Sequence, residues 1–106
     1  MANWQQLKKR IQLGQKNILT GDDIEQCFTD WGGAHKIPND AFEGCSSLKA
    51  VKIPPSVTSI EQYAFWDCSS LTAVTIPGSV TSIGRAAFRR CWSLEAVQIP
   101  LGVESI

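Results

Sequence analysis

Three stretches of the chain repeat one pattern, and this pattern decides the fold. Residues 42–60 read FEGCSSLKAVKIPPSVTSI, residues 65–83 read FWDCSSLTAVTIPGSVTSI, and residues 88–106 read FRRCWSLEAVQIPLGVESI. Their phenylalanines, cysteines and prolines recur every 23 residues. A fixed period of this length is typical of a repeat architecture, in which similar units stack along one axis.

Eleven positions of the repeat hold the same residue in all three units. Eight of them form the columns Phe42/Phe65/Phe88, Cys45/Cys68/Cys91, Leu48/Leu71/Leu94, Val51/Val74/Val97, Ile53/Ile76/Ile99, Pro54/Pro77/Pro100, Val57/Val80/Val103 and Ile60/Ile83/Ile106. A single unit cannot enclose its own apolar side chains, but stacked units cover one another's columns. The sequence therefore predicts a solenoid of the α/β repeat class, with its units stacked as parallel rungs.

Each unit contains the pattern of two short strands. In the segment Leu48–Ile53, Val51 and Ile53 point to one side and the residues between them point to the other, as in a half-buried strand. Pro54 cannot donate the next ladder hydrogen bond, so the chain turns there, as it does in every unit. The β-branched residues within 57–60 predict a second, shorter strand on the opposite side.

The first part of the chain breaks the period. We expect residues 1–33 to form a helical cap and residues 34–106 to hold one partial and about three 23-residue leucine-bearing units. Either Thr20 or Asp22 is expected to be the N-cap of a second helix, and terminal repeats need an element that covers their apolar columns. The alternative is a separate partner-binding or membrane-surface helix that uses Trp4 and the basic cluster Lys8–Arg10. Two apolar stripes at helical spacing are present, Trp4/Leu7/Ile11 and Ile24/Cys27/Phe28/Trp31.

The pattern Phe-x-x-Cys-x-x-Leu-x-x-Val-x-Ile-Pro-x-x-Val-x-x-Ile-x-x-x-Ala-Phe resembles the BspA-like class of leucine-rich repeat. The resemblance covers residues 37–106, about two-thirds of the chain. It implies a leucine-rich-repeat solenoid with short parallel β-strands. Proteins of that class are often large bacterial or protist surface proteins with adhesive or protein-binding roles. The resemblance therefore implies a protein-interaction module, of a family that is often found at the cell surface or secreted.

The composition limits the partners and the location. Lys and Arg number 10 against 10 Asp and Glu, without a basic stripe or acidic tail, which argues against nucleic acid or an anionic membrane as the main partner. The longest apolar runs are a few residues, far below the roughly 20 needed to cross a bilayer. Residues 1–10 lack the apolar core of a secretory signal. We therefore expect either a cytoplasmic protein or one whose leader the sequence omits.

No group of residues in the sequence has the spacing of a catalytic or metal site. His35 is the only histidine, so a catalytic site could not recruit a second one, and we expect it to lie exposed on a second strand. Asp22, Asp23 and Asp30 lack the spacing of a calcium loop, and helix capping explains the first two. We therefore predict that the protein is not an enzyme and holds neither a metal nor a cofactor.

The four cysteines are expected to be structural thiols. Cys45, Cys68 and Cys91 are equivalent positions of the repeat, and Cys27 belongs to a helix stripe. The paired Cys-x-x-Cys spacing of zinc sites is absent from the sequence. Cysteines in adjacent rungs keep their Cβ atoms near the roughly 4.8 Å rung spacing, beyond the usual ~3.8 Å of a disulfide. We therefore expect them to remain reduced.

Two surfaces are candidates for binding a protein ligand. The outward face of the main sheet presents small and polar residues side by side, and a solvated sheet face would look the same. The second surface consists of aromatic residues in columns that otherwise hold mostly polar residues, and such residues are enriched in binding hot spots. Contact with the cap or a neighbouring loop is the alternative for these aromatics. The candidates are Lys49, Lys52, Thr72, Thr75, Glu95 and Gln98 on the sheet, and Tyr63, Trp66 and Trp92 among the aromatics.

We expect a non-enzymatic module for protein–protein interaction, either adhesive or part of a larger surface protein, whose ligand the sequence does not identify. The alternative is a structural repeat protein that assembles with itself. The sequence stops at Ile106, in the middle of a unit. The apolar residues of this last rung are therefore expected to lack a covering neighbour on one side, and the last strand to have an unpaired edge; these residues are Leu94, Val97, Ile99 and Val103. Two such edges can pair about a two-fold axis. This predicts a homodimer through the C-terminal rung.

Overall fold

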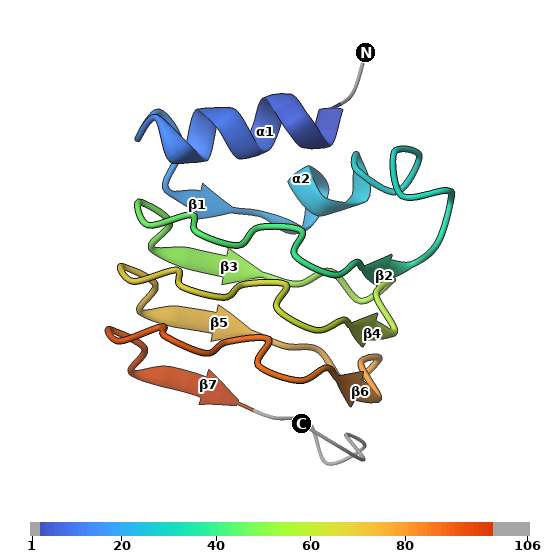
Figure 1. Ribbon diagram of the computed structural model, residues 1–106. Helices are drawn as coiled ribbons and strands as arrows, with labels where there is room; N and C mark the ends of the chain where they lie inside the picture. The colour runs from blue at the N-terminus through green and yellow to red at the C-terminus, as the bar shows by residue number, and fades with distance from the viewer. Residues whose placement is uncertain (1–2, 99–106) are drawn as a thin grey trace.

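Short parallel strands form two sheets that run side by side through the stack of repeats (Figure 1). The computed structural model describes residues 3–98. The main sheet has the order β1-β3-β5-β7, and the smaller sheet has the order β2-β4-β6. The bounds are Ile18–Leu19 (β1), Lys36–Ile37 (β2), Ala50–Lys52 (β3), Ser59–Ile60 (β4), Ala73–Thr75 (β5), Ser82–Ile83 (β6) and Ala96–Gln98 (β7). The predicted solenoid of short parallel strands is confirmed.

The register places equivalent residues of successive repeats beside one another. In the main sheet Val51 pairs with Val74, and Val74 pairs with Val97. The hydrogen-bond ladder continues beyond the strands, since the amide of Phe65 donates to the carbonyl of Ala87 at 2.8 Å. Backbone groups in the loops are therefore satisfied by a neighbouring rung, as they are in the strands.

A column of stacked phenylalanines runs through the core. The ring centroids of Phe42 and Phe65 lie 5.6 Å apart with their planes 14° from parallel, and those of Phe65 and Phe88 lie 5.4 Å apart at 2°. Phe42 and Phe65 are fully buried. The leucine, isoleucine and valine columns complete the core, and no polar or charged residue of the described chain is buried with them. Burial of these columns is the main force that holds the rungs together.

The helix α1, Asn3–Gln12, lies across the first rung of the stack (Figure 1). It buries Leu7 and Ile11, and Trp4 packs against the core. The indole Nε1 of Trp4 donates a hydrogen bond to the carbonyl of Ala41 at 2.8 Å. The amphipathic stripe thus predicted this helix and its buried face correctly.

The strand β1 was not expected from the sequence. It follows α1 and pairs in parallel with β3, so the main sheet begins within the segment that was expected to be a helical cap. Leu19 pairs with Val51, a spacing longer than the 23 residues that separate later rungs. The extra residues form α2 and the turns that follow it, and they hide this first rung from a search at one fixed period.

The second helix is shorter than its apolar stripe predicts. The helix α2 spans Gly21–Glu25 and begins with a capping box between Thr20 and Asp23, after which the chain continues in turns to Gly33. Thr29 and the residues around it are weak helix formers, which favours turns over a continued helix. The predicted second helix is therefore wrong in length, although the apolar residues of its stripe still pack against the core.

The last half of the third repeat, residues 99–106, lies outside the described residues. Ile99 and Val103, which the homodimer hypothesis places at the contact, fall in this part of the chain. Within residues 3–98, no helix is both long and apolar enough to cross a membrane.

Candidate functional site

The outward face of the main sheet carries a row of polar residues, which we call the sheet strip. It consists of Lys49, Lys52, Thr72, Thr75, Glu95 and Gln98, and the side chain of Gln98 lies outside the described part of the structure. The other five side chains are exposed, as predicted. The Thr72 hydroxyl donates to the carbonyl of Lys49 at 3.1 Å, so this threonine reinforces the backbone ladder. The sheet strip offers charges and hydroxyls to a partner, without an aromatic anchor.

Trp66, Arg90 and Trp92 form a second surface, which we call the aromatic cluster. The guanidinium carbon of Arg90 lies 5.4 Å from the ring centroid of Trp66 and 5.8 Å from that of Trp92. Both distances allow a cation–π attraction, worth about 0.5–1 kcal/mol at an exposed site. The Nε atom of Arg90 also lies 3.4 Å from a carboxylate oxygen of Asp67. Since Trp92 remains 74% exposed, the cluster offers a broad apolar surface with a fixed cation beside it.

Tyr63 and Arg90 have a backbone conformation that few side chains adopt. Their φ angles are 59° and 65°, in the left-handed region, where a Cβ atom costs roughly 1–2 kcal/mol. The equivalent positions in other units also have positive φ, at Asp40 and Ala86 for Tyr63 and at Gly44 and Asp67 for Arg90. The turn of the repeat therefore imposes this conformation, and a tyrosine and an arginine occupy it despite the strain.

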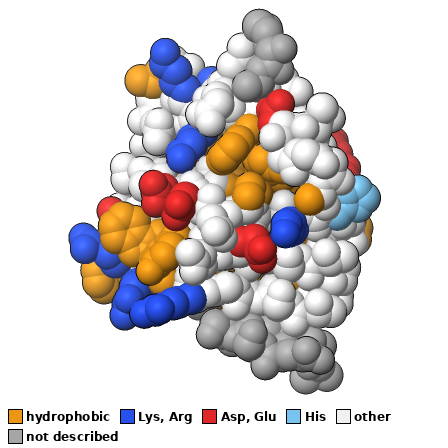
Figure 2. Space-filling view, turned by 45° about the vertical axis from the view of Figure 1, so that its right-hand side comes forward, with side chains coloured by type: hydrophobic (Ala, Val, Ile, Leu, Met, Phe, Trp, Pro, Cys, Tyr) orange, Lys and Arg blue, Asp and Glu red, His pale blue; other side chains and the backbone are white. Residues whose placement is uncertain are grey.

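A shallow groove of about 340 Å³ adjoins the aromatic cluster and shares Trp66 with it. It is lined by Asp40, Glu43, Gln62, Tyr63 and Trp66. Asp40 is the equivalent of Tyr63 in the preceding unit, and Glu43 is the equivalent of Trp66, so each acidic residue lies one rung from an aromatic one. Figure 2 shows hydrophobic side chains gathered beside acidic and basic ones on one face of the molecule. No residue of the sheet strip lines the groove.

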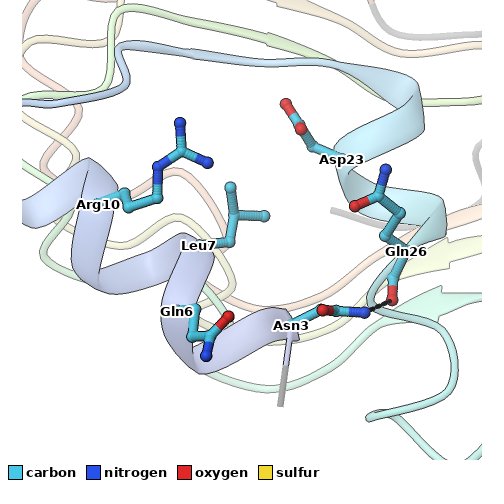
Figure 3. Close-up of a pocket in the computed structure, with 6 residues that line it drawn as sticks. All are labelled: Asn3, Gln6, Leu7, Arg10, Asp23 and Gln26. Atoms are coloured by element: carbon cyan, nitrogen blue, oxygen red, sulfur yellow. Dashed lines mark hydrogen bonds between the residues drawn. The ribbon is translucent and has the colours of Figure 1, made fainter. Parts of the chain in front are cut away.

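A smaller hollow, of about 120 Å³, lies between α1 and α2 (Figure 3). It is lined by Asn3, Gln6, Leu7, Arg10, Asp23 and Gln26. The side-chain amide of Asn3 donates to the carbonyl of Gln26 at 3.4 Å, and Asp23 pairs with Lys16 at 3.0 Å. Burial raises the pKa of Asp23, but hydrogen bonds from Thr20 and Lys16 outweigh burial and hold the pKa below its usual value. The first contact joins α1 to the end of α2, and the second joins α2 to the segment before β1, which gives the hollow a structural role.

His35 has a packing role on the surface. Its side chain is exposed, as predicted, and its ring stacks on Phe28 with the centroids 4.9 Å apart and the planes 21° from parallel. In the part of the chain that the structure describes, no three His, Cys, Asp or Glu side chains gather in a way that could hold a metal ion.

The four cysteines are free thiols, and Cys27, Cys45 and Cys68 are buried. Burial raises the pKa of Cys27 to about 12 and that of Cys45 to about 11. A hydrogen bond with Cys91, together with burial, also raises the pKa of Cys68. The same hydrogen bond lowers the pKa of Cys91, which is only partly buried. Three of the thiols therefore behave as small apolar core residues, and Cys91 is the one that is only partly buried.

The repeat period, the parallel strand order and the stacked apolar columns point to one family. The model of the BspA type leucine-rich repeat region matches residues 27–106. The chain belongs to this family. Its leucine-rich repeats are the rungs described above. Within residues 3–98, three rungs have one strand in the main sheet and one in the smaller sheet, and β7 adds a fourth strand to the main sheet. No curated protein is similar enough to the chain to support a comparison.

Solved structures of bacterial leucine-rich repeat proteins are similar to this chain. A leucine-rich repeat protein from Bacteroides ovatus is 37% identical, with a TM-score of 0.64, over 67% of this chain and 19% of its own. The T. pallidum leucine-rich repeat protein (TpLRR) is 35% identical, with a TM-score of 0.62, over 64% of this chain and 32% of its own. A leucine-rich cell surface protein from Faecalibacterium prausnitzii is 42% identical, with a TM-score of 0.56, over 57% of this chain and 16% of its own. The chain thus spans a third or less of the length of these proteins.

The columns of the leucine-rich repeats predicted the aromatic residues of the site but not the charged residues beside them. The structure places Tyr63 and Trp66 in one groove and connects Trp66 to Trp92 through Arg90. A signal for the acidic side of the groove was present, because its two carboxylates occupy the same repeat columns as Tyr63 and Trp66. The place of Arg90 depends on its left-handed turn. A signal for this turn was present in the same repeat column, which holds Gly44 and Asp67 in the preceding units.

Proposed function

We propose that this leucine-rich repeat chain is a non-enzymatic module that binds a protein ligand through the aromatic cluster and the groove. The observation that carries the proposal is the 74% exposure of Trp92, with Arg90 against its ring and against that of Trp66. Tryptophan and arginine are the side chains most enriched in binding hot spots. A partner surface would remove the exposed indole from water, which is the main source of affinity at such contacts.

The backbone beneath the aromatic cluster supports a prepared binding surface. The carbonyl of Trp66 accepts a hydrogen bond from the amide of Gly44 at 2.7 Å, and the amide of Asp67 donates to the carbonyl of Arg89 at 2.8 Å. The rung of Trp66 is thus hydrogen-bonded on both sides, and one of these neighbours is the rung that carries Arg90 and Trp92. A surface ordered before binding loses less conformational entropy when a partner arrives.

The sheet strip extends the proposed interface. Glu95 lies three positions after Trp92 in the chain, so the strip begins within roughly 10 Å of the aromatic cluster. Its lysines and carboxylate are exposed. Exposed charges at the edge of an interface steer the approach of a partner and fix its orientation more than they add affinity. We place Lys49, Lys52, Thr72, Thr75, Glu95 and Gln98 in this role.

We infer that the protein ligand is met at the cell surface, where the module would act in adhesion as part of a longer repeat array. The likeness to the Faecalibacterium prausnitzii leucine-rich cell surface protein supports this location. The chain spans only a small share of the length of the similar proteins, and this supports its proposed place within a longer repeat array.

The experiment that tests the proposed function compares one variant of Trp92 with one control variant of Leu13. Trp92→Ser removes the exposed indole and restores the serine found at Ser46 and Ser69 in the same column, so the repeat should tolerate it. Leu13→Ser is the matched control, since Leu13 is 61% exposed and lies outside the proposed interface. The immobilised wild-type protein is used to capture proteins from cell-surface extracts. Each captured protein is then purified and titrated against the wild type and both variants.

The proposal expects one binding partner whose affinity falls about 30-fold or more with Trp92→Ser, as for a hot-spot residue. Leu13→Ser should leave that affinity unchanged. Circular dichroism must show that both variants keep the wild-type melting temperature within a few degrees. Undiminished binding by a folded Trp92→Ser variant would overturn the assignment of the aromatic cluster.

Self-assembly is the competing function. Among the described residues, β7 is the last strand of the main sheet, which supports pairing of this edge with a second copy. Light scattering at micromolar concentration should then report about twice 11.6 kDa. Glu95→Lys combined with Gln98→Lys should return the protein to a monomer, because like charges would face each other across the two-fold axis. A wild type that stays monomeric at high concentration rules this function out.

A further inference from the structure

We propose that the groove binds an arginine side chain of the protein ligand. This inference rests on the proposed protein-binding function and adds the chemistry that the groove recognises. The lining combines two carboxylates, one amide and two aromatic rings, from Asp40, Glu43, Gln62, Tyr63 and Trp66. Aromatic faces attract a cation, and carboxylates accept the paired N–H groups of a guanidinium. The volume of about 340 Å³ lies at the small end of the roughly 300–1,000 Å³ of ligand pockets, which suits a single side chain.

The carboxylates of the groove have no positive partner in the described part of the chain. The three ion pairs there use other acidic residues, which are Asp23, Glu61 and Asp67. The ammonium of Lys8 approaches Asp40, but it donates to the main-chain carbonyl, at 3.4 Å, and leaves the carboxylate free. Two unpaired negative charges in one hollow favour a cationic group on the partner.

The molecule already contains one arginine bound in this chemical setting. The guanidinium of Arg90 lies against the ring of Trp66 and pairs with the carboxylate of Asp67. The groove presents the same combination, a tryptophan and a carboxylate, to the outside. An arginine fits better than a lysine, because its planar guanidinium can stack on a ring and donate two parallel hydrogen bonds at the same time.

The proposal is tested by titrating the full chain with short blocked peptides and following NMR signals. The probe is Gly-Gly-Arg-Gly-Gly, and the control is Gly-Gly-Gln-Gly-Gly, which is polar but uncharged. We expect the arginine peptide to shift the indole signal of Trp66 and the ring signals of Tyr63 in a saturable way. The shifts should weaken when sodium chloride is added, since salt screens exposed charges.

Two charge-removing variants and one matched control identify the site. Glu43→Gln and Asp40→Asn should each weaken the arginine peptide about two- to fivefold, the range for an exposed ion pair. Asparagine also tolerates the positive φ of Asp40, so this change removes charge without disturbing the turn. Asp22→Asn removes an exposed carboxylate on α2, outside the groove, and should leave the peptide affinity unchanged.

Equal shifts with the glutamine peptide would overturn the proposal. So would shifts of the same signals by methyl β-glucoside in the absence of an effect of the arginine peptide, because the groove would then be a carbohydrate site. If the arginine peptide does not bind, but a protein partner still loses affinity for the Trp92→Ser variant, the inference about arginine is wrong and the proposed function stands. If the peptide binds but Trp92→Ser leaves every partner in place, the arginine site stands and the aromatic cluster is not the main contact.

Discussion

Single residues must satisfy a turn that the repeat imposes twice in each unit. The chain meets this demand with Gly44 and Asp67 in one column, and Arg90 follows in the same column with a φ of 65°. Glycine and aspartate adopt the left-handed region with little strain, whereas tyrosine and arginine do not. Strained residues cluster at functional sites, and Tyr63 and Arg90 both belong to the candidate interface. Residues chosen for stability alone would be glycine or asparagine at these positions.

The cost of the left-handed turn is measurable where no function competes with it. Ala86 has a φ of 57°, and Ala86→Gly should raise the free energy of unfolding by about 0.5–1 kcal/mol, because removal of Cβ strain outweighs the added entropy of the unfolded chain. Gly44→Ala should lower it by about 1 kcal/mol. A Cβ at Gly44 would meet nothing within 4 Å, so conformation alone acts there. Urea denaturation measures both values, and changes of the same sign would contradict the argument.

The cysteines differ in reactivity because their environments differ. Iodoacetamide attacks the thiolate, and the raised pKa values of Cys27 and Cys45 leave almost none at pH 8. Cys91, with a lowered pKa and partial exposure, should be alkylated first in the native protein. Mass spectrometry should show one early modification that Cys91→Ser abolishes, and four modifications after denaturation without reductant. A mass that shows a bridge between Cys68 and either neighbour would refute the free-thiol assignment.

Comparison of single residues between the repeats shows which parts of the candidate site the sequence predicts. Trp92 stood out because the other units have serine in its column, and it is 74% exposed. Tyr63 and Trp66, which stood out by the same contrast, are only half exposed, so the contrast predicted exposure correctly for Trp92 alone. Arg90 did not stand out, since arginine is ordinary on a surface and its neighbours in space are set by the turn conformation. Contrast between repeats identifies unusual residues, but it does not show which of them meet.

Among the structural elements, the phenylalanine column connects three rungs through stacked rings. Phe65 is fully buried between Phe42 and Phe88. Phe65→Ala should lower the free energy of unfolding by about 3–5 kcal/mol, through lost burial and the cavity left behind. Phe88→Ala should cost less, because Phe88 is only partly buried among the described residues. Urea denaturation gives both values, and a loss within about 0.5 kcal/mol for Phe65→Ala, typical of a surface site, would mean that the rungs are misaligned.

The elements that the sequence predicted are those with a repeated pattern. Strands β3 to β6 each have an equivalent one period away, so periodicity places them. The strand β1 has only two residues, and its distance to β3 differs from the period because α2 and its turns are inserted between them. The pairing of β1 with β3 depends on hydrogen bonds between residues that lie far apart in the sequence. Local pattern therefore predicted α1, and only the stacked structure revealed β1.

At the scale of the whole molecule, the solenoid is a short one-dimensional stack. Its stability is approximately the sum of the rungs and of the interfaces between neighbours. The described chain has four strands in the main sheet, so each interface is a large fraction of the total. The end that α1 covers is one of these interfaces, since Leu7 and Ile11 of the helix are buried against the first rung. Loss of this cover should therefore weaken the entire stack.

The contribution of the α1 cover to stability can be measured at its most buried side chain. Ile11 is completely buried, whereas Leu13, close by in the chain, is 61% exposed. Ile11→Ala should lower the free energy of unfolding by about 2–4 kcal/mol, a large share of the roughly 5–15 kcal/mol of a small domain. Leu13→Ala, the matched control, should change it by less than about 0.5 kcal/mol.

The manner of unfolding tests the one-dimensional stack more strictly than the magnitude does. If α1 supports every rung through the chain of interfaces, the near-ultraviolet circular dichroism and the far-ultraviolet signal of the Ile11→Ala variant should be lost at one urea concentration, as in a two-state transition. If α1 were a separate element, the signals of Trp4 and Trp31, which meet at 5.8 Å beside the helix, would change first and leave the strands folded. Separate transitions would contradict the assignment of α1 as the cover of the repeat stack.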